Sequence, residues 1–186
     1  INQINIKGLS DNDNSKIYNE LDDLFYKNIL FVNKDEVKKI INKYNIIDEY
    51  SIKKIYPSTI NINIKPTAFV ARHSGNDLLV GANGKLIEDL GNNEILPYIF
   101  GEFNSQDFLS FKKKIARSNF TFTKFRTLYF FPSNRWDILT NDDVLIKLPQ
   151  NNLSKSLNLA YKIMNSDDFK DKNLIDLRIN KHAIVK

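Results

Sequence analysis

The residues that could perform catalytic or metal chemistry are few in this chain. The 186 residues include two histidines, His73 and His182, and no cysteine. Both histidines stand beside turn-forming residues, where we expect solvated surface side chains rather than a general base. Two histidines without cysteine make a zinc site improbable, and thiol or disulfide chemistry is excluded. The sequence therefore predicts no catalytic residue, no metal and no cofactor.

Two short motifs suggest chemistry at first sight but are explained by turns. Asp142 and Asp143 form an acidic pair at a predicted hairpin turn, where aspartate is favoured for its local hydrogen bonding. Residues 81–84, Gly-Ala-Asn-Gly, lack the Lys-Ser/Thr pair that completes a phosphate-binding loop. Because reactive groups are missing, we predict a binding protein rather than an enzyme.

Composition and charge indicate a folded chain and leave one other binding class open. The chain is 42% hydrophobic and 26% charged, which is ordinary for a folded protein, and no run of about 18 apolar residues predicts a membrane span. Its formal net charge of +5 admits a nucleic-acid partner. The lysines are interspersed with acids, however, and the densest run, residues 112–114, is interpreted as a solvated helix face. Aromatic residues between 120 and 131 are assigned to a core.

The first 66 residues predict a compact α+β unit with the order β-α-α-β-β. Alternating isoleucines at Ile60, Ile62 and Ile64 indicate a half-buried strand. Asn33 followed by Glu36 resembles the capping box of a helix. The expected strands cover residues 3–8, 46–56 and 59–65, and the expected helices cover residues 14–27 and the segment after Asn33.

Beyond residue 66 the pattern changes to short strands and turns, which predicts a mainly antiparallel β-domain with flanking helices. Helices are expected over residues 104–116 and 153–164, the second from Leu153, Leu157, Ala160 and Met164 on one face. The strands include 122–131, a hairpin of 136–139 with 144–148, and a closing strand or hairpin over 174–185. The fold class is α+β, with domains at 1–66 and 67–186.

The C-terminal segment, residues 174–186, reads as extended chain up to the last residue. A strand at a chain end is a candidate for the edge of a sheet. Its unpaired N–H and C=O groups can template a strand from another protein. This segment is therefore the predicted partner-binding element.

Four motifs in this order resemble the FtsQ/DivIB family of bacterial cell-division proteins. Residues 4–8, Ile-Asn-Ile-Lys-Gly, resemble the opening strand of a POTRA domain, and residues 52–62, containing Tyr56-Pro57-Ser58-Thr59, resemble its hairpin. Residues 135–148 resemble the hairpin of the family's β-domain, and Ile175-Asp176-Leu177-Arg178 resembles a strand near the family's C-terminus. The resemblance covers essentially the whole chain, although residues 63–66 lack the acidic residue common in the family.

The resemblance implies a non-enzymatic divisome scaffold that links early and late division proteins and helps to control septal peptidoglycan synthesis. It implies a bitopic protein of the inner membrane, with this part in the periplasm at the septum. The implied partners are FtsB and FtsL, with FtsB adding a strand at the C-terminal edge. The POTRA unit is expected to contact another divisome protein.

The resemblance also carries over candidate partner-binding residues. Arg135 is a candidate charge partner for an acidic residue of FtsB, although pairing with Asp137 or Asp176 inside the chain is an equal alternative. The remaining candidates are Ile179, Asn180, Lys181, His182, Ala183, Ile184 and Val185.

Two rival functions stay open at this point. One is a POTRA-type polypeptide-binding module of an outer-membrane assembly or secretion system, although the second part of the chain does not read as another POTRA copy. The other is a basic nucleic-acid-binding protein, for which a steep salt dependence of binding would be diagnostic.

Overall fold

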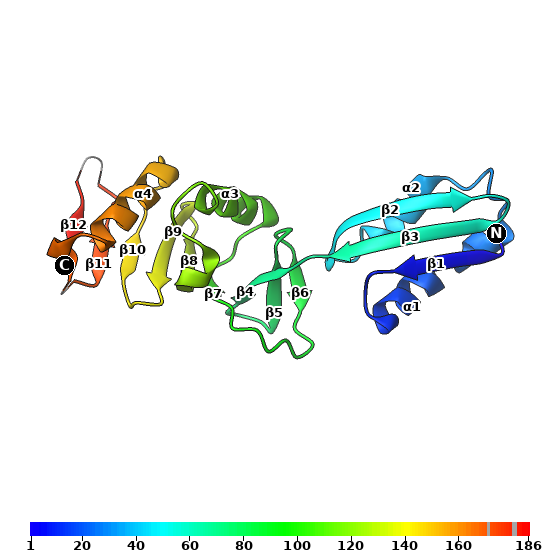
Figure 1. Ribbon diagram of the computed structural model, residues 1–186, viewed down its shortest axis with the longest axis horizontal. Coiled ribbons are helices and arrows are strands. Elements are labelled where there is room, and N and C mark those ends of the chain that lie inside the picture. Colours follow the sequence, from blue (N-terminus) through cyan, green and yellow to red (C-terminus); the bar gives the residue numbers. More distant parts are fainter. Residues whose placement is uncertain (171, 180–181) are drawn as a thin grey trace. The chain divides into compact units, whose positions relative to one another are not determined.

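The computed structural model describes residues 1–170, 172–179 and 182–186. The chain divides into two compact units, Ile1–Ala68 and Phe69–Lys186 (Figure 1). Each unit has its own hydrophobic core and combines helices with a sheet, which confirms the predicted α+β class. The predicted domain boundary after residue 66 falls at the end of a strand and stays a prediction.

The N-terminal unit follows the predicted order of strand, two helices and two strands. Its three-stranded sheet has the order β1-β3-β2, in which β1 is parallel and β2 antiparallel to β3. Ile60, Ile62 and Ile64 point into the core with the apolar faces of the helices, as their alternation predicted. The elements are β1 (Gln3–Lys7), α1 (Asp11–Glu20), a 3-10 helix (Asp22–Tyr26), α2 (Lys34–Ile41), β2 (Ile47–Ile55) and β3 (Thr59–Pro66).

The starts of the two helices in this unit are decided by their caps. α1 begins at Asp11, three residues before the expected position, because the Ser10 hydroxyl accepts the N–H of Asp13 as an N-cap. Asn33 caps α2 as predicted and accepts the N–H of Asp35. Glu36 instead pairs with Lys27 at 2.7 Å, so its side chain takes part in an ion pair across the unit.

The C-terminal unit is built on a nine-stranded sheet with the order β12-β11-β10-β9-β8-β7-β4-β5-β6. Antiparallel pairs predominate, and β4–β7, β7–β8 and β10–β11 are parallel. The strands are β4 (Phe69–His73), β5 (Leu78–Gly81), β6 (Leu86–Glu88), β7 (Tyr98–Phe100), β8 (Phe125–Phe131), β9 (Arg135–Thr140), β10 (Leu145–Lys147), β11 (Leu174–Asp176) and β12 (Ile184–Val185).

Two helices, α3 (Ser105–Ile115) and α4 (Leu153–Met164), lie over the same face of this sheet (Figure 1). α3 starts with a reciprocal capping box between Asn104 and Asp107. Its Phe111 ring stacks on Trp136 of β9 with ring centroids 4.4 Å apart. These contacts fix α3 against β9, while pairing of β9 with β10 and of β10 with β11 places β9 near the C-terminal strands.

Three local expectations for this unit need correction. Residues 122–124 were expected to be the first residues of a strand over 122–131. They form a 3-10 helix instead, and β8 begins at Phe125. The three-residue strand β7 was not predicted from the sequence. His73 is buried rather than solvated, and its ring packs against Phe103 while Nδ1 accepts the N–H of Gly75.

Candidate partner-binding surface

The C-terminal segment forms a hairpin in which β12 pairs with β11 and lies at the end of the sheet. Leu174 and Lys186 exchange two backbone hydrogen bonds, of 3.0 and 3.1 Å. In an antiparallel pair, hydrogen-bonded positions alternate with positions whose N–H and C=O point away from the partner. The next residue, Val185 opposite Ile175, therefore directs both of its backbone groups to the open side of β12.

The side chains of β12 divide between the two faces of the sheet. Val185 is half-buried and packs against the main core of the unit. Ile184, opposite Asp176, is 38% exposed. Because both strand residues are uncharged, this edge carries no charged strand side chain that would oppose pairing with a neighbouring chain.

Five of the seven candidates from 179 to 185 can be placed, and only the last two lie in a strand. Ile179, His182 and Ala183 are exposed in the loop between β11 and β12, where the N–H of His182 donates to the C=O of Ile179. Asn180 and Lys181 lie outside the described residues. The candidate surface is therefore a two-residue strand with an exposed loop, rather than one long strand.

A cavity of about 280 Å³ lies between this loop and the start of α4. Exposed apolar side chains of Ile179 and Leu159 contribute to its lining. Leu159 was missed in the sequence, although it lies on α4 away from the buried stripe, and an apolar residue in that position is a detectable signal. The other lining residues are Pro149, Asn151, Asn152, Ser156, Leu177, His182 and Ala183.

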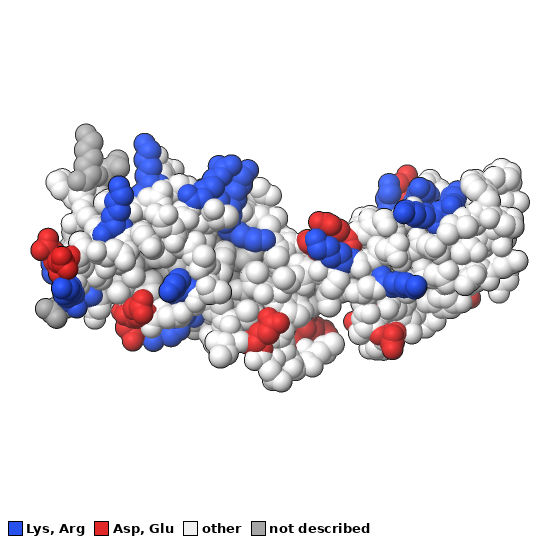
Figure 2. All heavy atoms as spheres, in the orientation of Figure 1, with Lys and Arg blue, Asp and Glu red and all other residues white. Residues whose placement is uncertain are grey.

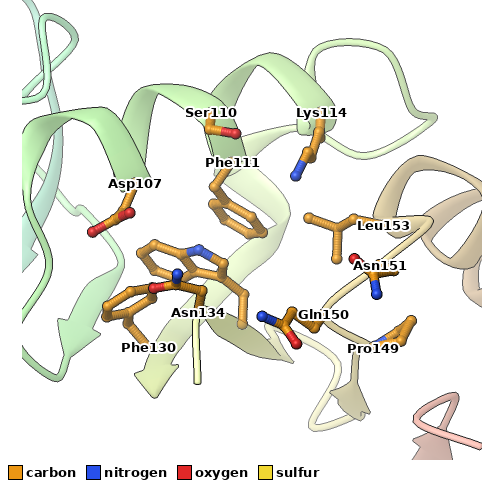
Figure 3. Close-up of a pocket in the computed structure, with 11 residues that line it drawn as sticks. Asp107, Ser110, Phe111, Lys114, Phe130, Asn134, Pro149, Gln150, Asn151 and Leu153 are labelled. Carbon is orange, nitrogen blue, oxygen red and sulfur yellow. The ribbon is translucent and has the colours of Figure 1, made fainter. Parts of the chain in front are cut away.

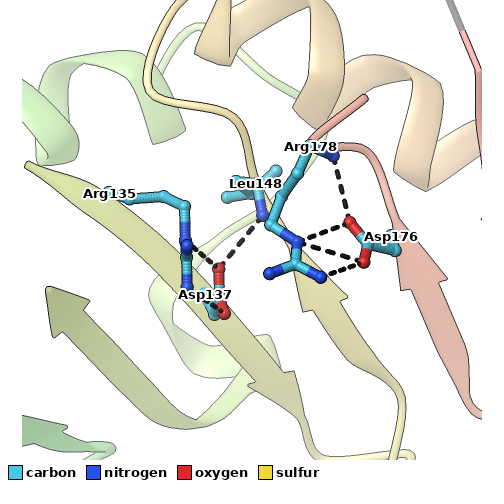
Figure 4. A network of polar contacts seen from close by, with 5 residues as sticks. All are labelled: Arg135, Asp137, Leu148, Asp176 and Arg178. Carbon is cyan, nitrogen blue, oxygen red and sulfur yellow. Dashed lines mark hydrogen bonds and ion pairs between the residues drawn. The ribbon is translucent and has the colours of Figure 1, made fainter. Parts of the chain in front are cut away.

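Arg135 pairs inside the chain with Asp137, two residues along β9. Its Nε and Nη2 donate to the two carboxylate oxygens at 3.2 and 3.3 Å, and its guanidinium lies 4.1 Å from the centre of the Phe131 ring. Asp137 also accepts the N–H of Leu148 at 3.2 Å (Figure 4). Burial raises the pKa of Asp137 above its ordinary value, although Arg135 acts in the opposite direction.

A second pair joins Asp176, the last residue of β11, to Arg178, two residues beyond the strand. Arg178 Nη2 donates to Asp176 at 2.6 Å, and its backbone N–H donates to the same carboxylate. The Arg178 guanidinium lowers the pKa of Asp176, which in turn raises the pKa of Arg178. Figure 4 shows each arginine beside its own aspartate. Of the internal partners expected for Arg135, Asp137 is therefore the one observed, and a partner role stays a prediction.

Another cavity, of about 260 Å³, opens between α3 and residues 149–153 (Figure 3). Its apolar lining includes Phe111, Phe130 and Trp136, and polar side chains surround them: Asp107, Ser110, Lys114, Asn134, Gln150 and Asn151. The Asp107 carboxylate is engaged in the cap of α3. This cavity suits contact with polar groups, and it contains none of the residues predicted for partner binding.

The part of the chain that the structure describes contains neither a cluster of metal-binding side chains nor a membrane-spanning helix. Throughout residues 1–170, 172–179 and 182–186, no three His, Asp or Glu side chains come together as a possible metal site. Over the same part of the chain, no helix combines the length and apolarity needed to cross a bilayer.

Comparison with known proteins decides the family. A family model described as "POTRA domain, FtsQ-type" matches residues 1–65, and one described as "Cell division protein FtsQ/DivIB, C-terminal" matches residues 68–178. The chain belongs to the FtsQ/DivIB family. Arg135 lies within the matched part of this FtsQ/DivIB chain, whereas the candidates from Ile179 to Val185 lie beyond it.

Curated FtsQ proteins are similar over most of the chain. "Cell division protein FtsQ" of Rhizobium meliloti (strain 1021) is 22% identical over 82% of this chain and 51% of its own length. The FtsQ of Rhizobium radiobacter is 25% identical over 75% of this chain and 70% of its own length. The chain thus spans about half the length of the first of these relatives. FtsQ proteins are membrane-anchored cell-division scaffolds and not a known enzyme family.

Proposed function

We propose that this chain is the periplasmic part of a divisome scaffold that binds FtsB, and with it FtsL, by strand addition at β12. In this role it links early and late division proteins and helps to control septal peptidoglycan synthesis. The whole protein is then bitopic in the inner membrane and acts at the septum without catalysis. Family membership favours this function over a POTRA module of an outer-membrane assembly system.

The observation that carries the proposal is the outward direction of the Val185 N–H and C=O at the end of the sheet. A strand of FtsB placed there gains backbone hydrogen bonds worth about 0.5–1.5 kcal/mol each. Two strand residues supply few such bonds. The cavity lined by Ile179 and Leu159 therefore supports the proposal, because it offers side-chain contacts that raise affinity and specificity.

The decisive test is proline substitution along this edge. Val185→Pro removes an outward donor while leaving the hydrogen bonds of Leu174 with Lys186 in place. We expect it, like Ala183→Pro, to weaken FtsB binding at least tenfold in a titration of the 186-residue chain. Ile184→Pro should lose binding for a different reason, because the N–H of Ile184 faces β11 and its loss disrupts the hairpin itself.

Circular dichroism and thermal unfolding separate these two causes. Val185→Pro should unfold at nearly the wild-type temperature, whereas Ile184→Pro should not. A matched control is Ile52→Pro on β2, an edge strand of the other unit. Ile52 lies opposite Ile62, whose backbone groups face β1, so the Ile52 N–H also points outward and its loss should leave FtsB binding unchanged. Retention of full FtsB affinity by a folded Val185→Pro variant would contradict strand addition at β12.

Arg135 tests the charged part of the proposed interface. Arg135→Glu should weaken FtsB binding more at low salt than at high salt, because screening reduces a charge contact. Arg178→Glu is the comparison, because it makes the same charge change at an arginine that is also paired inside the chain, with Asp176, and that is not a predicted contact of FtsB; it should change binding less. An Arg135→Glu effect that does not depend on ionic strength would count against a charge contact with FtsB.

A further inference from the structure

One end of the N-terminal unit carries large apolar side chains that are exposed to an unusual degree. Phe31 is 83% and Tyr26 86% exposed, Leu30 is 64%, and Ile55 and Tyr56 are 48% and 61%. Isolated exposed apolar residues are common, but a group of five at one end of a small unit indicates an interaction surface. We call these five residues the apolar tip.

Hydrogen bonds tie the segments of the apolar tip together. The Lys54 Nζ donates to the C=O of Ile29 at 2.8 Å, which joins the end of β2 to the loop before α2. The amino group of Ile1 donates to the C=O of Lys27 at 2.8 Å, and the N–H of Asn2 donates to the C=O of Ser58. The exposed side chains therefore stand on a constrained surface made by two loops and the start of β1.

Charges of both signs surround the apolar tip. The exposed Asp22 and Asp23 lie on the 3-10 helix that carries Tyr26, whereas lysines flank the tip at the start of α2 and the end of β2. The nearby acids Asp35 and Glu36 are each paired with a lysine, Lys38 at 2.9 Å and Lys27 at 2.7 Å. Lys34 and Lys53 are exposed, and within the described residues neither has an acidic partner. On the face drawn in Figure 2, the end of this unit is uncharged, and both lysine and acidic side chains lie further along it.

We propose that the apolar tip binds the surface of a bilayer that contains anionic lipids. Tyrosine, phenylalanine and leucine side chains are the ones that enter the headgroup region of a membrane, with lysines contacting anionic headgroups beside them. The acyl-chain region of such a bilayer suits the exposed apolar side chains of the tip, and its anionic headgroups suit the neighbouring lysines. Because FtsQ proteins are membrane-anchored, a bilayer is also a surface that the whole protein meets.

The test measures association of the 186-residue chain with vesicles by flotation. Vesicles of phosphatidylcholine with about one-third phosphatidylglycerol provide the anionic surface, and pure phosphatidylcholine vesicles are the comparison. We expect binding to the anionic vesicles that falls with added salt. Leu30→Ser with Phe31→Ser should lower the partition coefficient about tenfold or more, because two side chains lose their insertion.

Matched variants separate the lipid contact from general effects. Leu90→Ser with Ile95→Ser removes two highly exposed side chains, 82% and 103%, in the other unit, and should change vesicle binding less than about twofold. Lys34→Glu with Lys53→Glu should lower binding to anionic vesicles only. Circular dichroism of each variant verifies folding.

Three results would overturn the proposal. The first is a wild-type chain that does not associate with anionic vesicles, and the second is a folded Leu30→Ser, Phe31→Ser variant that associates as well as wild type. The third is a wild-type dimer in solution that this double variant converts to a monomer, because the apolar tip would then be a contact between two copies of the chain. None of these results bears on FtsB binding at β12.

Discussion

The N-terminal unit ends its sheet on strands of five and nine residues, β1 and β2, whereas the C-terminal unit ends on β6 and β12, of three and two residues. The longest of these edges, β2, carries charged residues along its length, among them Asp48, Glu49, Lys53 and Lys54. Charges on a long edge oppose uncontrolled pairing with other strands. β12 is short and uncharged instead.

This difference teaches how each unit can use an open edge. A long edge supplies many backbone hydrogen bonds and so needs protection, while a two-residue edge supplies few and needs added side-chain contacts to bind a partner. In the C-terminal unit those contacts are available from the β11–β12 loop and from Leu159 on α4. In the N-terminal unit the exposed apolar side chains gather at one end, at Phe31 and Tyr56, rather than along β2.

The largest expected effect tests whether the two units differ in stability and unfold separately, and it uses one glycine in each unit. Gly8 and Gly101 both have positive φ, and an added Cβ would lie 1.7 Å from the Ile64 oxygen and 2.1 Å from the Phe130 oxygen. Alanine at either position should lower the free energy of unfolding of its own unit by about 3 kcal/mol. Trp136, the only tryptophan, reports on the C-terminal unit alone in denaturant unfolding followed by fluorescence.

Gly91→Ala is the matched control for this pair of variants. Gly91 also has positive φ, at 99°, but no atom lies within 4 Å of the added Cβ, so only backbone strain of about 1 kcal/mol is expected. Gly8→Ala should leave the Trp136 transition unchanged. An equal shift of that transition by Gly8→Ala and Gly101→Ala would show that the two units unfold as one.

pH is expected to have a smaller effect on the stability of the two units, with opposite signs in the two. Lys43 and Tyr44 lower the pKa of Glu20 in the N-terminal unit. The contribution of Glu20 to the free energy of unfolding is therefore present above its pKa in the unfolded chain. That contribution is lost as pH falls through its lower pKa in the folded unit. Burial raises the pKa of Asp137 in the C-terminal unit. Stability gained from protonated Asp137 is present at low pH and lost as pH rises through that raised pKa.

Substitution of Glu20 or of Asp137 should remove the pH dependence of stability from its own unit only. Glu20→Gln should cost the N-terminal unit about 0.5 kcal/mol or less at neutral pH, because solvent screens this exposed pair, and nothing at low pH. Asp137→Asn should remove from the Trp136 transition the loss of stability that accompanies ionisation of Asp137 as pH rises. Denaturant unfolding at several pH values measures both, and the same sign in the two units would contradict the assigned pKa directions.

Elements with a strong local pattern could be predicted from the sequence. α4 has the predicted bounds, since Leu153, Leu157 and Ala160 repeat at helical spacing and are all buried. In β3, alternation likewise predicted which face is buried. β8 departs from simple alternation because a register shift between Phe125 and Thr127 places Thr127 and Leu128 both in buried positions. Such a shift depends on the neighbouring strand and leaves no local signal.

The candidate surface was only partly predictable. Extended chain at residues 184–185 could be predicted, because Ile184 and Val185 have strong β-propensity. The internal pairing of Arg135 with Asp137, rather than with Asp176, depends on the neighbouring strands and on Arg178, which engages Asp176. Leu159 and the cavity beside Ile179 come from α4 and the hairpin loop, two segments separated in the sequence.

The amino-acid sequence by itself determined the α+β class, the order of the elements and the scarcity of reactive groups, because periodicity, capping residues and composition are local properties. Only the tertiary structure decided that β12 lies at the end of its sheet with Val185 directed outward. It also decided that Tyr26, Phe31 and Tyr56 gather at one end of the N-terminal unit. The physical reason is that strand order and shared surfaces arise from contacts between residues far apart in the chain.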